Sequence, residues 1–419
     1  MIGLCDMRSF YCSCEKVFRP DIRDRGVVVT SNNDGVVVAL DDRAKAAGIK
    51  KFEPYFKQRQ LIERAGVLAF SSNYELYGEV SGRIMATLAE LVPNSIEVYS
   101  IDECFVDFSA VPRVELKAFA VMLRDTIWQQ QGIKMGVSIA PSKTLAKLGQ
   151  CAAKQYPQLE GVCVLEQAHQ WQWLADRVDV GEVWGIGRKL MRKLKTRALS
   201  TAGDLSVMAQ ADARVLQGVT LVRTIRELQG EPCIDIDSQP QPKQTIISSR
   251  SFGQKQTDIK PLQEAVSHYA VRAGVKLRAQ SSLCFRLSAW LQTSAHDTQP
   301  YADELSVSLP GGTADSRVLS RAAVALVATL YRPGCRYAKA GVALHDIRPE
   351  RFTQCDLLAP RPENSARLMQ VMDGVNQRFG LGAIKLARQG GENSFAMKRA
   401  MKSPSYLTRW QEIPRIRLG

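Results

Sequence analysis

Strand-like and helix-like patterns alternate along the first 165 residues, and this alternation restricts the fold more than any other feature of the chain. Short apolar runs rich in β-branched residues predict strands, and apolar residues spaced by three and four predict helices. The segments follow one another as strands at 2–5, 26–33 and 35–40, helices at 41–48 and 75–92, a strand at 98–108, a helix at 114–131, a strand at 134–140 and a helix at 142–154. Asp41 and Ser142 are suited to cap the helices that they precede, and helical spacing predicts that Lys143, Lys147 and Lys154 lie near one face of the helix at 142–154. This order is typical of an α+β or split βαβ domain.

The strand signal disappears after residue 165. Residues 166–231 indicate short helices, and "DIDSQPQPKQT" at 235–245 lacks periodicity, which is typical of an interdomain linker. Beyond it we expect strands at 284–293, 304–310 and 339–347 and helices near 261–279 and 316–331. The last 70 or so residues are rich in Pro and Arg and offer little core. The pattern therefore predicts an α+β multidomain protein.

Composition is that of a large globular protein. Its 419 residues, with 45% apolar content, suffice for two to four packed domains. No run of about 18 uncharged apolar residues is present, so we expect no membrane-spanning helix. The first residues carry acids and bases where a signal peptide needs an apolar segment, and the ten cysteines form no CxxC pair. We therefore expect a reducing, cytoplasmic setting, without a disulfide framework or a zinc site.

Charge is unevenly distributed along the chain. The net charge is +14, from 56 Lys and Arg against 42 Asp and Glu. Residues 1–110 contain 13 basic and 16 acidic residues, a net of −3, so residues 111–419 carry +17. An acidic region on a basic molecule suits a protein that binds divalent cations at one place and a phosphate backbone elsewhere.

The stretch "VYSIDECFVDF" at 98–108 predicts a half-buried strand with two adjacent carboxylates, Asp102 and Glu103, in its middle. Unpaired carboxylates are costly to bury, so two of them in a core strand need a partner. Neighbouring residues of a strand point to opposite faces, so both acids can reach one ion only at a strand end or a bend. Asp6 follows the apolar run "IGLC", and a first strand beside this segment would bring three carboxylates together.

Two interpretations of these acids stay open on the residues alone. A cluster of Asp6, Asp102 and Glu103 would bind Mg²⁺ and leave coordination positions for substrate phosphates. Two ions held in this way can activate an attacking oxygen and stabilise a leaving one. Alternatively, Asp102 and Glu103 occupy a solvent-facing hairpin tip, because paired acids are common at turns.

The chain resembles the Y-family of translesion DNA polymerases, in particular the UmuC-like group that forms the catalytic subunit of DNA polymerase V. The resemblance rests on an ordered set of stretches that together cover nearly the whole chain. These are "CDMRSFYCSCEKVFRPD", "VVVTSNNDGVVVA", "FSSNYELYGEVSGRIM", "YSIDECFVDF", "GVSIAPSKTLAKL", "VWGIGRKL", "RELQGEPC", "SRSFG" and "MKRAMKSPSY".

The resemblance implies a right-hand polymerase architecture with a ferredoxin-like palm, small fingers, a helical thumb with a helix-hairpin-helix motif, and an α/β little finger. The implied boundaries are 1–10 and 74–165 for the palm, 11–73 for the fingers, 166–231 for the thumb, 232–242 for a linker, 243–347 for the little finger and 348–419 for a partner-binding C-terminal tail. Asp6, Asp102 and Glu103 are then the catalytic ligands of two Mg²⁺ ions, and the Met7 carbonyl is a further metal ligand.

By the same resemblance, Phe10, Tyr11, Lys45 and Lys154 bind the incoming deoxynucleoside triphosphate. Tyr11 matches the family's steric gate, a flat ring that leaves no room for a 2′-hydroxyl. Judged from the residues alone, a core aromatic beside Phe10 is the favoured interpretation of Tyr11.

The segment "VVVALDDRAK" departs from the family. Leu40, Asp41 and Asp42 stand where relatives more often have an Arg followed by small or polar residues. Two acids near a triphosphate would repel it, which puts nucleotide affinity in question.

The stretch "VWGIGRKLMRKLKTR" predicts a contact with primer–template DNA. Gly185 and Gly187 stand in a helix-hairpin-helix pattern, whose backbone N–H groups can hold a phosphate. Six basic residues follow within ten positions, beginning with Arg188 and Lys189. The little finger carries a net +6, from 13 basic and 7 acidic residues, and there the resemblance implies that Arg250 contacts the duplex backbone.

Two parts of the tail match partner-binding segments. "QCDLL" lies where UmuC-like proteins carry a sliding-clamp peptide, so Gln354, Leu357 and Leu358 are candidate contacts with the clamp (the beta subunit), although Leu358 replaces the usual aromatic residue. Residues 381–419 hold eight basic and two acidic residues. By resemblance they contact a UmuD-like processed dimer and the RecA filament, and by composition alone they are a basic arm.

The sequence therefore predicts an error-prone, template-directed DNA polymerase that performs translesion synthesis in the SOS DNA-damage response by two-metal nucleotidyl transfer. No exonuclease segment is recognisable, which fits low fidelity. One rival is a non-catalytic scaffold that keeps the fold and binds DNA or the clamp, which the altered "ALDDR" favours. Another is a nucleotidyl cyclase with a similar palm, which would need neither the helix-hairpin-helix nor the basic little finger.

Overall fold

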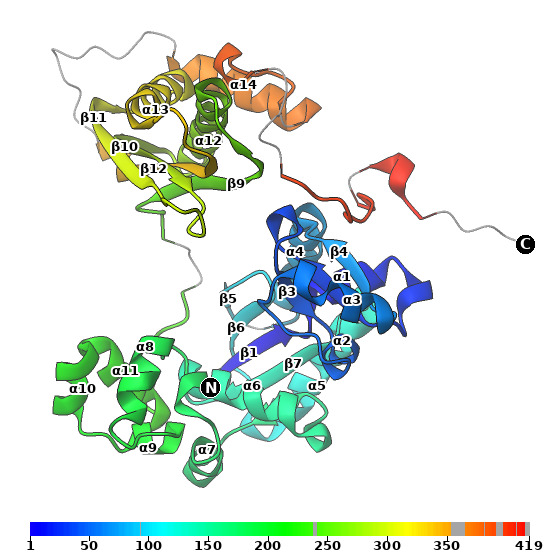
Figure 1. Ribbon diagram of the computed structural model, residues 1–419. Helices are drawn as coiled ribbons and strands as arrows, with labels where there is room; N and C mark the ends of the chain where they lie inside the picture. The colour runs from blue at the N-terminus through cyan, green and yellow to red at the C-terminus, as the bar shows by residue number, and fades with distance from the viewer. Residues whose placement is uncertain are drawn as a thin grey trace, which may run out of the picture. The chain divides into compact units, whose positions relative to one another are not determined.

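The structure, a computed structural model, describes residues 1–92, 94–237, 241–352, 365–380, 382–390, 397–407 and 409–414. The chain divides into two compact units (Figure 1). The first consists of Met1–Ser31, Gly35–Pro240 and Met401–Gly419, and the second of Asn32–Asp34 and Gln241–Ala400. The C-terminal end of the chain therefore belongs to the same unit as the N-terminal end.

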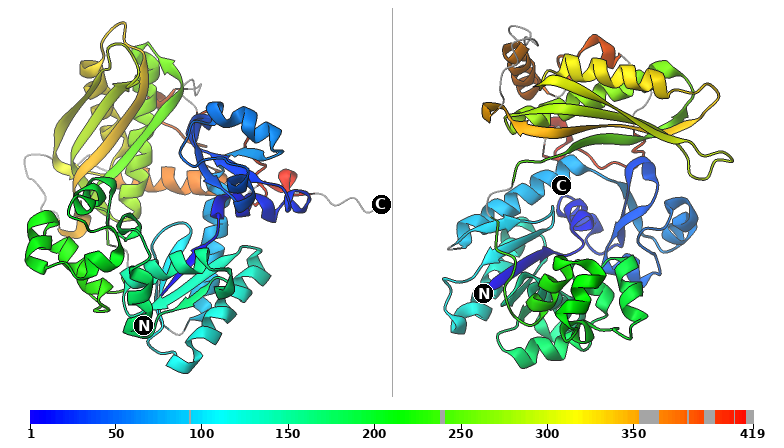
Figure 2. Two further views of the ribbon diagram at one scale, coloured as in Figure 1. Left: turned by 60° about the horizontal axis from the view of Figure 1, so that its bottom comes forward. Right: turned by 90° about the vertical axis from the view of Figure 1, so that its left-hand side faces the viewer.

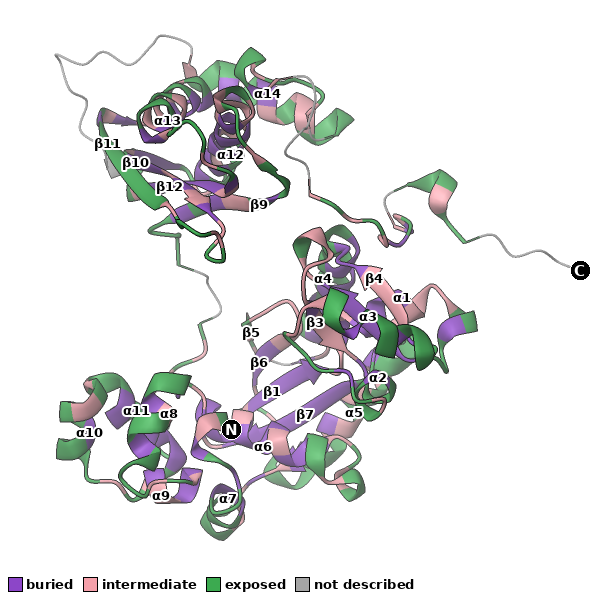
Figure 3. Ribbon diagram, viewed as in Figure 1, coloured by how far each residue is buried: buried purple, intermediate pink, exposed green. Residues whose placement is uncertain are grey.

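A five-stranded sheet forms the centre of the first unit, in the order β5-β6-β1-β7-β8. Its strands are β1 (Ile2–Met7), β5 (Ile96–Val98), β6 (Glu103–Asp107), β7 (Met135–Ala140) and β8 (Val162–Val164). β1 pairs antiparallel with both β6 and β7, while β7 and β8 are parallel. The middle strands are buried along most of their length (Figure 3), as their apolar runs predicted.

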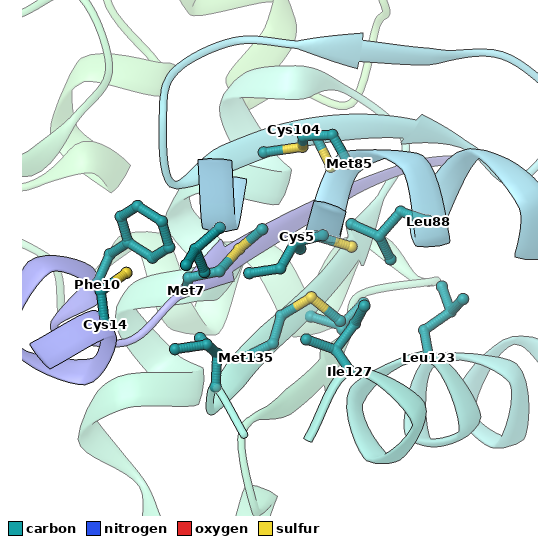
Figure 4. Packing of buried hydrophobic residues seen from close by; sticks show 14 of the residues in the cluster. Cys5, Met7, Phe10, Cys14, Met85, Leu88, Cys104, Leu123, Ile127 and Met135 are labelled. Carbon is teal, nitrogen blue, oxygen red and sulfur yellow. The ribbon is translucent and has the colours of Figure 1, made fainter. Parts of the chain in front are cut away.

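Helices cover both faces of this sheet. α1 (Phe10–Val17), α4 (Tyr74–Leu91) and α5 (Leu116–Gln131) share a core with one face, and α6 (Lys143–Gln155) lies against the other. Because side chains alternate along β1, Cys5 and Met7 enter the core with α4 and α5 (Figure 4), whereas Leu4 packs on the α6 side. Asp6 has the same parity as Leu4 and therefore belongs to the α6 face.

A smaller sheet, in the order β3-β2-β4, lies next to α1. Its strands are β2 (Val27–Thr30), β3 (Val37–Leu40) and β4 (Leu68–Ser71), and α2 (Asp42–Ala46) and α3 (Tyr55–Arg64) lie between β3 and β4 in the chain. Asp41 caps α2 as predicted, since its side chain accepts a hydrogen bond from the Ala44 N–H. Gly48 follows the helix with a φ of 85°, which explains the glycine at this stop.

The segment after β8 is helical, as the loss of the strand signal predicted. It contains α7 (Ala168–Ala175), α8 (Arg188–Lys195), α9 (Ala202–Ser206), α10 (Gln210–Gln217) and α11 (Val219–Leu228). These helices share one apolar core with α6. The fully buried Glu227 joins them, because Oε2 accepts the N–H and hydroxyl of Thr144, and Oε1 accepts the N–H groups of Cys233 and Ile234.

The second unit is built on a four-stranded antiparallel sheet in the order β11-β10-β12-β9. Its strands are β9 (Ile246–Gln256), β10 (Ser282–Thr293), β11 (Ala302–Thr313) and β12 (Tyr337–Pro349). α12 (Ile259–Ala279) and α13 (Ser316–Leu330) cover one face of this sheet, as Figure 2 shows from two sides. The predicted strands and helices of this region are confirmed, and β9 is an additional strand that the sequence did not predict.

The C-terminal tail, for which little core was expected, contains the helix α14 (Ser365–Phe379). Met369 is buried, and Arg278 of α12 forms a two-pronged ion pair with Asp373 (2.7 and 2.8 Å). Only Met369 and Met372 of this helix are buried, so its apolar face is too short to stand out in the sequence.

Membrane-spanning helices and disulfides were the two features that composition argued against. None of the helices in that part is long and apolar enough to cross a membrane. The nine cysteines within it are free thiols, most of them buried.

Candidate active site

Asp102 and Glu103 lie at the tip of the β5–β6 hairpin, so the prediction of one continuous strand over 98–108 is wrong. β5 ends at Val98 and β6 begins at Glu103. The N–H groups of Tyr99 and Ser100 both donate to the Glu103 carbonyl, at 3.1 and 3.0 Å. The turn contains no Gly, Pro or Asn, and apolar residues alternate through it as in a strand, so Ser100 and Asp102 alone marked the break.

Asp6 and Glu103 are direct neighbours across two strands. In the antiparallel register of β1 and β6, Asp6 lies opposite Glu103 and Leu4 lies opposite Phe105. Since residues two apart in a strand share a face, these four side chains all belong to the α6 face. On this face Asp6 and Glu103 therefore follow the apolar pair of Leu4 and Phe105, at the end of β1 and the start of β6.

Two lysines of α6 reach these acids. Nζ of Lys154 lies 2.8 Å from Oδ2 of Asp6, and Nζ of Lys147 lies 2.7 Å from Oε2 of Glu103. The lysines are about two helical turns apart and share one side of α6, as their spacing predicted. Lys143 belongs to the same series but is buried and pairs with Glu97 of β5.

The closeness of the two acids changes their titration. Burial raises the pKa of Asp6 to about 6; Lys154 opposes this shift, and the charge of Glu103 adds to it. Burial also acts on Glu103, but Lys147 outweighs it and brings the pKa of Glu103 below its usual value. Two carboxylates this close need nearby positive charge in order to be ionised together.

Asp102 stands in the adjoining turn. Its carbonyl accepts the Met7 N–H at 2.9 Å, which holds it beside the end of β1. Its carboxylate accepts the Ser100 hydroxyl at 2.6 Å. Among the residues that the structure describes, no three Asp, Glu, His or Cys side chains come close enough to surround an ion. The structure thus brings Asp6 and Glu103 together and leaves the Asp102 carboxylate engaged in its own turn.

The donor set fits a hard divalent cation. Mg²⁺ is bound in proteins by one or two carboxylates, with other positions left to water and phosphate oxygens. Asp6 and Glu103 supply two carboxylates. The ammonium groups of Lys154 and Lys147 already lie beside them, so this place accommodates positive charge. Asp102 adds a third carboxylate in the adjoining turn.

Tyr11, in the first turn of α1, lies among aromatic rings. It stacks on Tyr77 with centroids 4.4 Å apart and planes inclined by 15°, and it meets Tyr74 edge-on at 6.1 Å. Burial raises the pKa of Tyr11, and Tyr74 and Asp102 are close enough to raise it further. Phe10 is buried in the core (Figure 4).

Asp41 is turned into the protein, so it does not contribute to the expected repulsion of a triphosphate. Besides capping α2, it accepts hydrogen bonds through Oδ2 from Nζ of Lys16 (2.6 Å) and from the Val27 N–H (3.1 Å). Asp42 and Lys45 are exposed on α2, and Leu40 ends β3.

Gly185 and Gly187 lie in the turn that leads into α8. Gly185 has a φ of 89°, a conformation that favours glycine. Gly187 is the N-cap of α8, and Arg188 and Lys189 are the first residues of this helix and are exposed. Free backbone N–H groups at a helix start, beside two cations, suit a phosphate.

An aromatic cage around Lys147 was not predicted. Nζ of Lys147 lies 4.3 Å from the ring centroid of Tyr99 and 5.7 Å from those of Phe105 and Trp184. Nε1 of Trp184 donates to the Tyr99 hydroxyl at 3.0 Å. Trp184, next to Gly185, therefore contacts both Tyr99 and Lys147, and Lys147 pairs with Glu103. Helical spacing singled out Lys147, but no sequence signal indicates that rings from three segments surround it.

The remaining candidate residues belong to the second unit or lie outside the described residues. Arg250 is part of β9, and its guanidinium donates to Sδ of Met397 at 3.3 Å. Gln354, Leu357 and Leu358 lie outside the residues that the structure describes.

Family models match three parts of the chain. Residues 5–150 match the impB/mucB/samB family, and residues 243–357 match the C-terminal domain of the same family. Residues 366–416 match a domain of unknown function.

Curated relatives match over the full length. Protein UmuC of Salmonella typhimurium is 43% identical over 424 residues, which is 100% of each chain. Protein MucB of Escherichia coli is 43% identical over 423 residues, 99% of each chain. DNA polymerase IV of Brucella melitensis is 24% identical and covers 91% of this chain and 83% of its own.

Solved structures share the fold. A Y-family DNA polymerase chimera matches with a TM-score of 0.66 and 20% identity over 83% of this chain and 99% of its own. An insertion ternary complex of Dbh DNA polymerase matches with a TM-score of 0.55 and 21% identity over 83% of this chain and 99% of its own. The chain therefore belongs to the impB/mucB/samB family and is a UmuC-like member of the Y-family, whose members are DNA-directed DNA polymerases.

Proposed function

We propose that this protein carries out error-prone, template-directed translesion DNA synthesis in the SOS DNA-damage response. One observation carries the proposal. Asp6 and Glu103 lie opposite each other at the end of the central strands, each with a lysine of α6, in a chain that aligns with UmuC from end to end.

In this proposal each part of the fold has a polymerase role. The five-stranded sheet is the palm (1–10 and 74–165), α1 and the three-stranded sheet are the fingers (11–73), and α7 to α11 are the thumb (166–231). The linker spans 232–242, the little finger 243–347, and the tail 348–419.

Two Mg²⁺ ions would be held by Asp6, Asp102, Glu103 and the Met7 carbonyl. When bound, they would stabilise the attacking and the leaving oxygens of an in-line displacement. The chain's own residues prepare for this. Burial has already removed most water from Asp6, and Lys147 and Lys154 keep the two neighbouring acids ionised until a cation arrives.

The reaction joins the primer 3′-oxygen to the α-phosphorus of the incoming deoxynucleotide and releases pyrophosphate. Lys154 and Lys45 would bind the triphosphate, and Asp6, Asp102 and Glu103 would hold the reacting oxygens in line through the cations. Such catalysis consists mainly of positioning and electrostatic stabilisation.

Tyr11 would act as the sugar gate. Its ring cannot move freely, because Tyr77 stacks on one face and Tyr74 contacts an edge. A ring held in this way, close to Asp102, would meet the 2′ position of the sugar and exclude a hydroxyl there.

The partners follow from the same family membership. Primer–template DNA would be held by the turn at Gly185 and Gly187, by Arg188 and Lys189, and by Arg250 on β9. The sliding clamp would bind Gln354, Leu357 and Leu358. A UmuD-like processed dimer and the RecA filament would bind the tail.

Primer extension across an abasic template site tests the proposal. The assay contains Mg²⁺, all four deoxynucleotides, a UmuD-like dimer and a RecA filament. We expect extension past the site, with errors. No extension on damaged or intact template, with DNA binding retained, would instead favour the non-catalytic scaffold, whose main support is reduced now that Asp41 is seen to pair with Lys16.

A further inference from the structure

The motif "MKRAMKSPSY" lies in the proposed partner-binding tail, yet part of it packs against the first unit. Its second half belongs to the strap, which we define as Met401–Leu407, and the strap is part of the first unit. It returns to this unit from the far end of the chain and lies against β4, α4 and α1.

The strap extends the smaller sheet at the end of β4. The Ser71 N–H donates to the Met401 carbonyl at 3.0 Å, and the Met401 N–H donates to Oγ of Ser71 at 2.9 Å. Ser71 and Lys402 form a parallel bridge. Because β4 is an edge strand, the strap covers backbone groups that this edge would otherwise present.

Asn73 ties the strap to the start of α4. Its Oδ1 caps the helix by accepting the Leu76 N–H. Its Nδ2 donates to Oγ of Ser403 at 3.0 Å and lies 3.4 Å from the carbonyls of Ser403 and Pro404. Asn73 and Ser403 are both buried, so one side chain fixes the helix start and the strap together.

The other end of the strap enters the core. Tyr406 is buried and stacks on Phe18, with centroids 5.0 Å apart and planes inclined by 15°. Leu407 packs against the same core. The strap is therefore held at both ends and cannot swing away as a loose arm.

Between these ends the strap faces the groups that support Tyr11. Glu15 of α1 is fully buried and accepts the Tyr77 hydroxyl at 2.6 Å. Burial raises the pKa of Glu15, and the hydrogen bond from Tyr77 opposes this shift. Tyr77 is the ring on which Tyr11 stacks.

We propose that the strap is a positioning element for sugar discrimination. Through Asn73 it fixes the start of α4, the helix that carries Tyr74 and Tyr77, so that Tyr11 stays where it meets the 2′ position. The inference rests on the proposed gate role of Tyr11. It assigns a function to seven residues of the segment that matches a domain of unknown function.

Two substitutions loosen the strap without touching Tyr11. Asn73→Ser keeps a helix-capping oxygen but removes the Nδ2 donor, and Ser403→Ala removes the hydroxyl that Nδ2 contacts. Ser405→Ala is the matched control, because Ser405 lies in the same strap and its side chain makes none of these contacts. Tyr11→Ala reports on the gate itself.

The measurement is the ratio of kcat/KM for deoxynucleotide to that for ribonucleotide in primer extension, with the UmuD-like dimer and the RecA filament present. We expect Asn73→Ser and Ser403→Ala each to lower the ratio by about three- to tenfold, the scale of one lost hydrogen bond. Ser405→Ala should leave it unchanged. The DNA Kd should not change in any of the variants, because the strap makes no part of the DNA contacts proposed above.

The outcomes separate this inference from the function on which it rests. If Tyr11→Ala lowers the ratio but Asn73→Ser and Ser403→Ala do not, the strap has no positioning role and the gate stands. If Tyr11→Ala leaves the ratio unchanged, the gate and the strap's role both fail. An inactive wild type would overturn both together with the polymerase. If Asn73→Ser does not fold, Ser403→Ala, which removes one oxygen atom, decides alone.

Discussion

Asp6 has the environment least suited to its charge among the three candidate acids. It is 7% exposed, lies opposite Glu103, and has a pKa raised to about 6. A carboxylate that is already out of water loses little further hydration when it binds a cation, which makes this an efficient place for a metal ligand. The ammonium groups of Lys147 and Lys154 also balance the negative charge of the two carboxylates. A divalent cation bound there can therefore replace part of their stabilising effect.

Lys147→Met tests this exchange. The substitution removes the ammonium group that lies 2.7 Å from Oε2 of Glu103. We expect the free energy of unfolding without Mg²⁺ to fall by about 1.5–3 kcal/mol, the worth of a hydrogen bond to a charged group. Mg²⁺ should recover most of this loss, because it supplies the missing positive charge. Urea unfolding with and without Mg²⁺ measures both effects.

Lys195→Met is the control for Lys147→Met. Lys195 forms an ion pair of similar length with Asp179, but both side chains are largely exposed, at 40% and 48%. Its loss should cost clearly less than the loss of Lys147 and should not depend on Mg²⁺. If Mg²⁺ stabilises Lys147→Met no more than the wild type, the lysine does not stand in for a cation.

At the scale of elements, buried acids join segments that are distant in the sequence. Glu227 connects α11 to the start of α6 and to the residues after α11. Two of its partners are at the N-terminal end of a helix, where a negative charge is favoured. The position of α6, and with it Lys147 and Lys154, depends on this one carboxylate.

Glu227→Gln should therefore be strongly destabilising. The amide would place an NH₂ group against N–H donors and remove the charge that four hydrogen bonds share. We expect a loss of about 3 kcal/mol or more, as for a buried pair that loses one partner. Glu231→Gln, in an exposed pair with Arg226, is the control and should destabilise the protein far less than Glu227→Gln. Equal urea midpoints for the two variants would contradict the joining role of Glu227.

Glu15 makes a contribution to stability that depends on pH. Its pKa is raised by burial, so the folded protein binds this proton more tightly than the unfolded chain does. The free energy of unfolding must then fall as pH rises from the ordinary value of 4.5 through the folded pKa. Glu15→Gln removes this pH-dependent contribution. We therefore expect the Tm of the variant to match that of the wild type near pH 4.5 and to exceed it at neutral pH. A difference in Tm that is constant with pH would refute this.

The sequence predicted those elements whose signals are local. The cap of α2 by Asp41 and the buried stripe of α4 follow from short-range patterns, and both are present. The β5–β6 turn was missed because apolar residues alternate through it as they do in a strand. The strap was missed because Asn73 and Ser403 are 330 positions apart, and no local pattern indicates such a contact.

The residues of the candidate site were also predictable where their signals are local, whereas the contacts between them were not. Carboxylates in "IGLCD" and "YSIDE" stood out, because acids beside apolar runs are unusual, and helical spacing singled out Lys147 and Lys154. The register that places Asp6 opposite Glu103, and the hydrogen bond that turns Asp102 toward Ser100, depend on tertiary contacts. Trp184 could not be connected with Lys147 from the sequence, because the two meet only through the packing of α6 against the helices that follow it.

At the scale of the whole molecule, charge separates the candidate metal site from the rest of the chain. Residues 1–110 have a net charge of −3, and residues 111–419 have +17. A chain of this kind should bind DNA mainly through released counterions, so that affinity falls steeply as salt rises.

Salt titration of DNA binding tests this reading of the charge. We expect log K to fall linearly with log salt, and Arg188→Gln with Lys189→Gln to reduce the slope by about 1 to 2, one unit for each lost phosphate contact. Arg83→Gln, an exposed cation of α4 paired with Glu79, should leave the slope unchanged. A slope that does not depend on Arg188 and Lys189 would remove the start of α8 from the DNA contacts.

The central claim is that Asp6, Asp102 and Glu103 together form a metal-dependent polymerase site, and Asp102 is its most exacting test because its carboxylate now faces Ser100. The measurement is the single-turnover rate of primer extension as a function of Mg²⁺ concentration for Asp102→Asn, with Asp125→Asn on the surface of α5 as the control. The account predicts that Asp102→Asn loses at least about 100-fold in rate at every Mg²⁺ concentration, with the DNA Kd unchanged. A rate for Asp102→Asn equal to that of Asp125→Asn and the wild type would contradict it.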